Sequence, residues 1–235
     1  MIKREIYMQR IRPFMNTDLI KVFTGIRRAG KSVMLELVKN ELKESGISEE
    51  NFLCINFEQF SNSQYLDVQS LYKKIVDFQK NTKGKIYLFF DEIQEVTGWE
   101  KCINSCRIDF DCDIYITGSN AKLLSGELAT YLAGRYVEFV IYPFSFAEFF
   151  EMNLLKNPNV DKSTCFMQFL KTGGMPFLSN FPDDDSAKSQ YLIDIYNSVV
   201  LKDIVKRNNI RDVDTLERIV AYAFSNIGHN SSKRY

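Results

Sequence analysis

One stretch near the N-terminus has the residue types and the spacing of a phosphate-binding loop. It fits the pattern G-x-x-x-x-G-K-[ST] in full and reads Gly25-Ile26-Arg27-Arg28-Ala29-Gly30-Lys31-Ser32, followed by Val33. Glycines let the backbone wrap closely around phosphate, so that successive N–H groups face the anion. In this pattern the lysine reaches the β- and γ-phosphates and the serine hydroxyl binds Mg²⁺. We therefore expect residues 25–33 to bind a nucleoside triphosphate, with Lys31 on the phosphates and Ser32 on the metal ion.

A pair of acidic residues ends an apolar run further along the chain. Residues 86–90 are Ile-Tyr-Leu-Phe-Phe, and Asp91 and Glu92 follow. Ligands of open α/β sheets bind at the carboxyl ends of the strands. We expect Asp91 to hold Mg²⁺ through a water molecule and Glu92 to act as general base on the attacking water. Alone, such a run is as often a strand leading into a solvated turn, so this interpretation depends on the loop beside it.

Three further residues are candidates for contact with the γ-phosphate. Ser119, and after it Asn120, follow the apolar run 113–117, where a short polar side chain can orient water. Both residue types also suit the N-cap of a helix. Arg135 can neutralise charge on the γ-phosphate, in its own subunit or in a neighbouring one. The alternative for Arg135 is a surface arginine that ends a helix.

Other residues near these motifs leave two interpretations open. Arg27 and Arg28 can contact phosphate or a partner, or face solvent. Gln94 can relay the presence of the γ-phosphate, although a turn residue is the favoured interpretation. Trp99 is expected to be a packing anchor.

The elements that must position these residues alternate between strand and helix. Apolar runs predict strands over 19–24, 52–57, 85–90, 113–117 and 136–142, and helical patterns fill 2–12, 31–44, 67–81, 99–110 and 121–132. Strands that are apolar throughout indicate a parallel sheet covered on both faces. After Pro143 only helical patterns occur, over 145–155, 163–171, 184–207 and 212–226. We expect an α/β domain over 1–143, a helical domain over 144–227 and a tail over 228–235.

The composition fits a globular protein whose balanced charges produce no strong overall electrostatic field. Hydrophobic residues make up 45% of the chain, and 30 basic residues balance 30 acidic ones, so net charge steers it to neither nucleic acid nor membrane. Five cysteines, an odd number, argue against a disulfide framework. The start lacks an apolar targeting segment, and no apolar run reaches the roughly 18 residues of a membrane span. We expect a cytoplasmic location and no membrane partner.

Basic residues near both ends keep a nucleic-acid-binding module open as an alternative. They are Lys3, Arg4, Arg10, Arg12, Lys202, Lys206, Arg207 and Arg211. Asp203, Asp212 and Asp214 interrupt the second group, so a solvated helix face is the favoured interpretation.

The order of the motifs resembles a prokaryotic family of AAA-type ATPases that carry a C-terminal region of unknown function (DUF4143-type). After the phosphate-binding loop come Asp-Glu-Ile-Gln (91–94), Thr-Gly-Ser-Asn (117–120), Leu-Ala-Gly-Arg-Tyr (132–136), Pro-Phe-Ser-Phe-Ala-Glu-Phe (143–149), Gly-Gly-Met-Pro (173–176) and Leu-Lys-Asp-Ile-Val (201–205). The resemblance implies a five-stranded parallel sheet of order 5-1-4-3-2. It also implies the roles given above for Lys31, Ser32, Asp91, Glu92, Ser119 and Arg135.

Family members usually continue into a winged-helix-like segment and a nuclease-like domain. Residues 225–228, Ser-Asn-Ile-Gly, resemble the start of that segment, so a truncated product or a fragment is expected here.

The function that the sequence favours is Mg²⁺-dependent binding and hydrolysis of ATP. ATP is preferred to GTP because the guanine-reading Asn-Lys-x-Asp is absent from the sequence, and the acid pair disfavours a small-molecule kinase. A nucleotide switch with little turnover and a homo-oligomer stay open.

Overall fold

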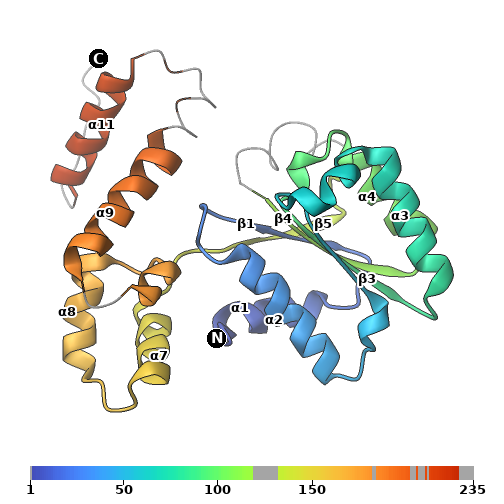
Figure 1. The fold of residues 1–235 in the computed structure, drawn as a ribbon, viewed down its shortest axis with the longest axis horizontal. Helices are drawn as coiled ribbons and strands as arrows, with labels where there is room; N and C mark the ends of the chain where they lie inside the picture. Colours follow the sequence, from blue (N-terminus) through green and yellow to red (C-terminus); the bar gives the residue numbers. More distant parts are fainter. Residues whose placement is uncertain are drawn as a thin grey trace. The chain divides into compact units, whose positions relative to one another are not determined.

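Five parallel strands form one sheet in the computed structural model, in the order β2-β3-β4-β1-β5 (Figure 1). The strands are β1 (Ile20–Thr24), β2 (Phe52–Asn56), β3 (Ile86–Asp91), β4 (Cys112–Thr117) and β5 (Tyr136–Val140). This order confirms the predicted 5-1-4-3-2 arrangement, and each strand lies within a residue or two of its predicted range.

The structure describes residues 2–118, 132–181, 184–201, 205, 210 and 212–227. Its α-helices are α1 (Glu5–Ile11), α2 (Lys31–Glu44), α3 (Val68–Asn81), α4 (Trp99–Asp109), α7 (Phe146–Lys156), α8 (Lys162–Thr172), α9 (Asp185–Ile195) and α11 (Val213–Ser225). Short 3-10 segments are η1 (Arg12–Phe14), η2 (Glu49–Asn51), η3 (Phe60–Leu66), η4 (Ile93–Glu95) and η5 (Pro176–Asn180). The helix predicted over 121–132 and the tail 228–235 lie almost wholly outside the described residues.

Alternate side chains of each inner strand point to opposite faces of the sheet, and helices cover both faces (Figure 1). In β3, Ile86, Leu88 and Phe90 join the core beneath α3 and α4, whereas Tyr87 and Phe89 join the core beneath α1 and α2. Burial on both sides explains why the strands have no polar alternation in the sequence. Trp99 is buried at the start of α4, in agreement with a packing anchor.

The chain divides into two compact units, residues 1–182 and 183–235. Helices α7 and α8 belong to the first unit, where Phe144, Phe149 and Cys165 form a small core together with Ile2. The predicted domain limits at 143 and 227 therefore differ from these compact units, and they stay a prediction. In the second unit, α9 ends at Ile195, inside the single helix predicted over 184–207.

A π-helical segment, η6 (Tyr196–Leu201), follows α9 directly. The helix predicted over 184–207 therefore continues past Ile195 as a wider helical turn.

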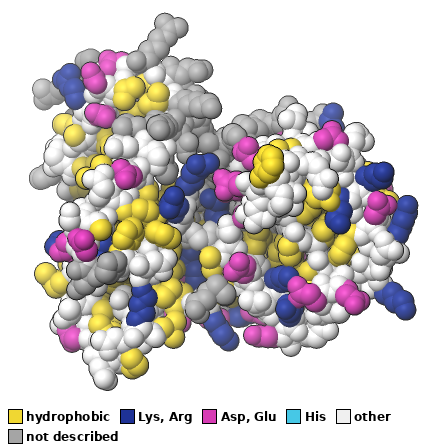
Figure 2. All heavy atoms as spheres, viewed as in Figure 1, with side chains coloured by type: hydrophobic (Ala, Val, Ile, Leu, Met, Phe, Trp, Pro, Cys, Tyr) yellow, Lys and Arg dark blue, Asp and Glu magenta, His cyan; other side chains and the backbone are white. Residues whose placement is uncertain are grey.

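Basic and acidic side chains are interspersed over the sheet-containing unit on the face shown in Figure 2. This mixture agrees with the balanced composition of the sequence. Within the described ranges, none of the helices combines the length and the apolar character that crossing a bilayer requires.

A buried ion pair joins β1 to β4 inside the sheet. Lys21 and Asp113 are fully buried, and the ammonium group of Lys21 contacts the carboxylate of Asp113 and donates to the carbonyl of Leu19 (2.7 Å). The same carboxylate accepts hydrogen bonds from the backbone N–H of Asn16 and the hydroxyl of Tyr115, both at 2.7 Å. Burial lowers the pKa of Lys21, and Asp113 opposes that shift. The charge of Lys21 therefore depends on the carboxylate.

We predict that Asp113→Asn lowers the free energy of unfolding by about 3 kcal/mol, because the buried ammonium group loses its counter-charge. The matched control is Asp111→Asn, which breaks the exposed pair with Lys85 and should cost less than about 1 kcal/mol. Urea unfolding of both variants measures the difference. Equal losses for the two variants would contradict this account.

Candidate functional site

Three motifs meet at one edge of the sheet because β1, β4 and β3 are parallel neighbours. Phe23 pairs with Thr117, and Phe90 pairs with Ile116. The residues that follow these positions are therefore brought to the same carboxyl edge. The phosphate-binding loop, the acid pair and the end of β4 all lie there, as the sequence predicts.

The loop connects β1 to α2, and its first glycine is held against another strand exit. Gly25 has φ 136°, and a Cβ atom at this position would lie 2.1 Å from the carbonyl oxygen of Ile141. A side chain at position 25 is therefore excluded unless the chain after β5 moves away. At the other end of the loop, α2 begins at Lys31 as predicted, so the positive end of its dipole faces the loop.

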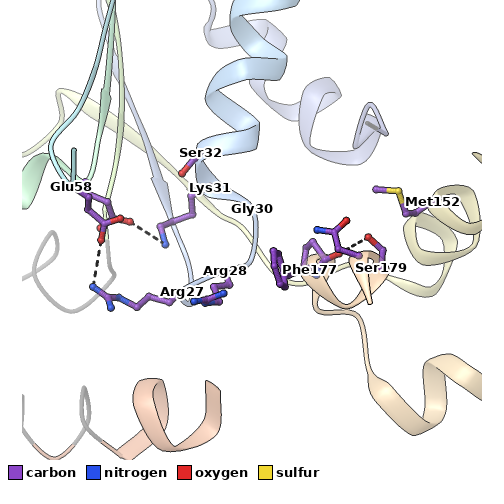
Figure 3. A pocket seen from close by; sticks show the side chains of 12 residues that line it. Arg27, Arg28, Gly30, Lys31, Ser32, Glu58, Met152, Phe177 and Ser179 are labelled. Atoms are coloured by element: carbon purple, nitrogen blue, oxygen red, sulfur yellow. Dashed lines mark hydrogen bonds and ion pairs between the residues drawn. The ribbon is translucent and has the colours of Figure 1, made fainter. Parts of the chain in front are cut away.

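The side chain of Lys31 lines the cavity drawn in Figure 3, and its ammonium group lies between the loop and the carboxylate of Glu92. The side chain is buried, and Nζ donates to the carbonyls of Gly25 (3.3 Å) and Ile26 (3.4 Å). Nζ also lies 3.7 Å from Oε1 of Glu92. Long contacts of this kind are weak, so an anion entering the loop can compete for the ammonium group.

The carboxylate of Asp91 is oriented by the ends of two neighbouring strands. Its Oδ1 accepts the hydroxyl hydrogen of Thr117 from β4, and its Oδ2 accepts from Nδ2 of Asn56 in β2 at 2.9 Å. The Thr117 hydroxyl oxygen also accepts from the backbone N–H of Glu92 at 2.9 Å. Neither Thr117 nor Asn56 was expected from the sequence to be a functional residue. One signal in the sequence could have found them: each is the last residue of a strand that lies beside the strand carrying Asp91.

Glu92 adopts a left-handed backbone conformation, with φ 55°. This conformation is unfavourable for a non-glycine residue, by roughly 1–2 kcal/mol, and the hydrogen bond from its N–H to Thr117 helps to hold it. The amide of Gln94 donates to Oε2 of Glu92 at 2.5 Å. Gln94 lies in the turn η4, as favoured from the sequence, and it also orients the Glu92 carboxylate.

A cavity of about 580 Å³ opens beside the loop (Figure 3). One side is formed by the loop and the acidic residues near it, and the other by α7 and η5. The lining residues are Arg27, Arg28, Gly30, Lys31, Ser32, Glu58, Glu92, Met152, Pro176, Phe177, Ser179 and Asn180. A volume of this size suits a small-molecule ligand.

The two loop arginines both line this cavity, and each has a partner within the chain. Arg27 lies 3.7 Å from the carboxylate of Glu58, and the guanidinium group of Arg28 lies 5.8 Å from the ring centroid of Phe177. The side chains of both loop residues are thus placed toward the ligand space, where phosphate contact stays a prediction.

A second cavity, of about 270 Å³, adjoins the first at Ser32. Its lining includes Ser32 from α2 and Asp91 from β3. Hydroxyl and carboxylate oxygens are the ligands that Mg²⁺ prefers, directly or through water. The donor set therefore fits the predicted metal ion, with Ser32 and Asp91 beside one open space.

Arg135 lies at the opposite edge of the sheet from the loop. Its carbonyl accepts from the N–H of Ile20, the first residue of β1, at 2.9 Å, and its side chain donates to Asn104 in α4 at 3.1 Å. The five residues of β1 separate it from the loop by about 16 Å. The structure thus does not bring Arg135 to the loop of its own subunit, and a role in a neighbouring subunit stays a prediction. Ser119 and Asn120 lie outside the described residues.

Arg4 is a site residue that the sequence analysis assigned to a basic stretch. Its side chain is almost fully buried, and Nη1 donates to the carbonyl of Ala29 in the loop at 3.0 Å. The C=O and the following N–H of a trans peptide point in opposite directions, so this bond turns the N–H of Gly30 away from Arg4. Arg4 thereby fixes the orientation of one loop peptide.

The same guanidinium group joins the loop to α7. Nε donates to Oε1 of Glu148 at 2.8 Å, and Nη2 donates to the carbonyl of Tyr142 at 2.8 Å. Glu148 also completes the capping box of α7 with Ser145. Burial opposes ionisation of Glu148, but the bonds from Arg4 and Ser145 outweigh it and lower the pKa of the carboxyl.

Two of the four N-terminal basic residues proposed for nucleic-acid contact are therefore engaged within the chain. Arg4 is buried, and Arg12 pairs with Glu5 and Glu41. The second group, Lys202, Lys206, Arg207 and Arg211, lies outside the described residues.

Residues 17–150, more than half of the chain, match the family model described as an AAA domain. The chain belongs to this AAA-domain family. It is also 42% identical to an uncharacterized protein of Haemophilus influenzae over 99% of this chain and 58% of that protein. A Methanocaldococcus jannaschii protein, also uncharacterized, is 34% identical over 88% of this chain and 47% of its own length. The chain thus spans about half the length of these curated relatives, and the DUF4143-type region stays a prediction.

Solved structures share the AAA fold at low sequence identity. DnaA from Aquifex aeolicus bound to AMPPCP superposes with a TM-score of 0.52 at 15% identity, covering 97% of this chain and 71% of DnaA. Orc1 from Aeropyrum pernix in complex with DNA gives 0.51 at 12% identity, covering 94% and 66%. These likenesses confirm an AAA-type P-loop nucleotide-binding fold.

We predict that Arg4→Met lowers the free energy of unfolding by about 3 kcal/mol or more, because Glu148 is left buried without its counter-charge. Arg12→Met is the matched control: its ion pairs are more exposed, and its loss should stay near 1 kcal/mol. Urea unfolding measures both variants. The double variant Arg4→Met with Glu148→Gln should recover part of the loss, and equal effects of the two single variants would contradict the role of Arg4.

Proposed function

We propose that this chain binds ATP together with Mg²⁺ and hydrolyses it. The observation that carries the proposal is the position of Lys31, whose ammonium group lies between the loop carbonyls and the carboxylate of Glu92. A phosphate-binding cation and a candidate general base thus meet at one cavity. The AAA-domain family supports the same function.

Binding would begin at the loop backbone. The N–H groups of the loop and the first turn of α2 attract the triphosphate, and Lys31 exchanges its long contacts for charge-assisted bonds to phosphate. Ser32 and, through water, Asp91 would hold Mg²⁺, which would supply positive charge that neutralises the phosphates. Thr117 and Asn56 keep the Asp91 carboxylate in place.

Hydrolysis would follow from release of Glu92. Once Lys31 turns to the phosphates, the Glu92 carboxylate loses its ion pair and can accept a proton from the attacking water. Gln94 keeps that carboxylate oriented through the bond to Oε2.

We propose Ser119, with Asn120 second, as the residue that orients the water. We also propose Arg135 as a cation supplied to a neighbouring subunit, which requires a homo-oligomer. The cytoplasm stays the predicted location.

We predict that Glu92→Gln lowers the rate of phosphate release by at least about 100-fold while ATP still binds, because only the general base is lost. Lys31→Ala should lose ATP binding itself. Glu95→Gln is the matched control, since Glu95 is an exposed acid in the same turn, and it should leave the rate unchanged. Phosphate release and ATP binding are measured on each protein, with and without DNA.

Wild-type protein that releases phosphate no faster than the Glu92→Gln variant would contradict hydrolysis. Tight ATP binding without turnover would then favour the nucleotide switch.

We predict that Asp91→Asn raises the Mg²⁺ concentration for half-maximal phosphate release by about tenfold or more, because one metal-orienting carboxylate is lost. Asp77→Asn, an exposed change in α3, is the control. Titration of Mg²⁺ after treatment with a chelator measures this requirement. Equal Mg²⁺ requirements for Asp91→Asn and wild type would remove Asp91 from the metal site.

A further inference from the structure

The far wall of the larger cavity is built by a segment that is hydrogen-bonded to the chain after β5, at Phe144. The carbonyl of Gly174 accepts a hydrogen bond from the N–H of Phe144 at 2.7 Å. A Cβ atom at Gly174 would lie 2.0 Å from the carbonyl oxygen of Phe144, so glycine is needed for this approach. The contact places η5 opposite the phosphate-binding loop, within the same compact unit.

Phe177 presents an aromatic ring to the cavity from η5. Its side chain is 45% exposed. A planar cation already lies near the ring, because the guanidinium group of Arg28 is 5.8 Å from its centroid. Figure 3 shows Arg28 and Phe177 side by side, and Phe181 packs against the Phe177 ring at 5.8 Å. The ring is therefore supported by the residue that follows η5, and it lines the cavity.

The other cavity has no comparable surface among its lining residues. Its aromatic residue, Phe89, is 3% exposed and is stacked on Tyr115 with ring centroids 4.8 Å apart. The rest of its lining includes charged and amide side chains such as Glu36, Lys39 and Gln59. That cavity suits the metal-ion side of the site, and the larger one offers an aromatic face.

We propose that the base of the bound nucleotide stacks on Phe177, so that η5 and α7 form the base subsite of the AAA domain. This inference rests on the proposed binding of ATP and deepens it. A flat heteroaromatic base gains from contact with an aromatic ring and with the apolar surfaces of Pro176 and Met152, which line the same wall. The amide of Asn180 lines the cavity too and can donate to and accept from the edge of the base.

The test compares ATP with inorganic tripolyphosphate, which has the phosphates but no base. Equilibrium dialysis with Mg²⁺ measures both ligands on wild type and on Phe177→Ala. We expect Phe177→Ala to weaken ATP binding by about 5- to 100-fold, the range for loss of a base–aromatic stack. Tripolyphosphate should bind both proteins within about twofold, because it contacts only the loop.

Three further variants separate stacking from other effects. Phe166→Ala removes an aromatic side chain of matched exposure, 44%, that does not line the cavity, and it should leave ATP affinity unchanged. Phe177→Leu keeps an apolar side chain but should still bind ATP weakly. Phe177→Trp keeps an aromatic ring and should bind ATP with wild-type affinity. Thermal unfolding of each variant verifies that it is folded.

Unchanged ATP affinity in folded Phe177→Ala would overturn the base subsite while leaving ATP binding in place. Equal weakening of ATP and tripolyphosphate would also overturn it, because the effect would then come from the loop. Failure of the wild type to bind either ligand would instead refute the proposed function itself.

Discussion

The site depends on the close contact between the backbone at Gly25 and the backbone at Ile141. Strand β1 lies between β4 and β5, and the chain leaving β5 passes so near Gly25 that no side chain fits there. This contact shapes the start of the phosphate-binding loop. Parallel pairing of β1 with β4 and of β4 with β3 then brings Thr117 and Asp91 to the same edge. The positions of the loop, the acid pair and the strand ends thus follow from one sheet arrangement.

A buried guanidinium group extends this arrangement beyond the sheet. Arg4 contacts the loop at Ala29, the chain after β5 at Tyr142, and the first turn of α7 at Glu148. A planar side chain with several donors can satisfy three segments at once, which a lysine cannot do with the same geometry. The loop and the helical wall of the cavity are therefore joined through the hydrogen bonds of one residue.

Much of this architecture was predictable from the sequence, because apolar runs and the glycine pattern are local signals. The strand ranges, the start of α2 at Lys31 and the placement of Asp91 at the carboxyl end of its strand follow from such signals, whereas the strand order was implied by the resemblance to AAA-type ATPases. The role of Arg4 was not predictable: its partner Glu148 is 144 positions away, and its neighbours in the sequence are exposed. The Phe177 wall depends on the approach of Gly174 to Phe144. Both this wall and the role of Arg4 require three-dimensional contacts that no periodicity records. The remoteness of Arg135 follows instead from its place before a strand that runs parallel to β1.

We propose that the loop backbone and Lys31 together bind a triphosphate. Equilibrium dialysis of labelled ATP against the folded chain with Mg²⁺ is the decisive test. We expect saturation at one ATP per chain and displacement of the label by unlabelled inorganic tripolyphosphate. A folded chain that retains no label at any ATP concentration, or whose label tripolyphosphate never displaces, would contradict the account.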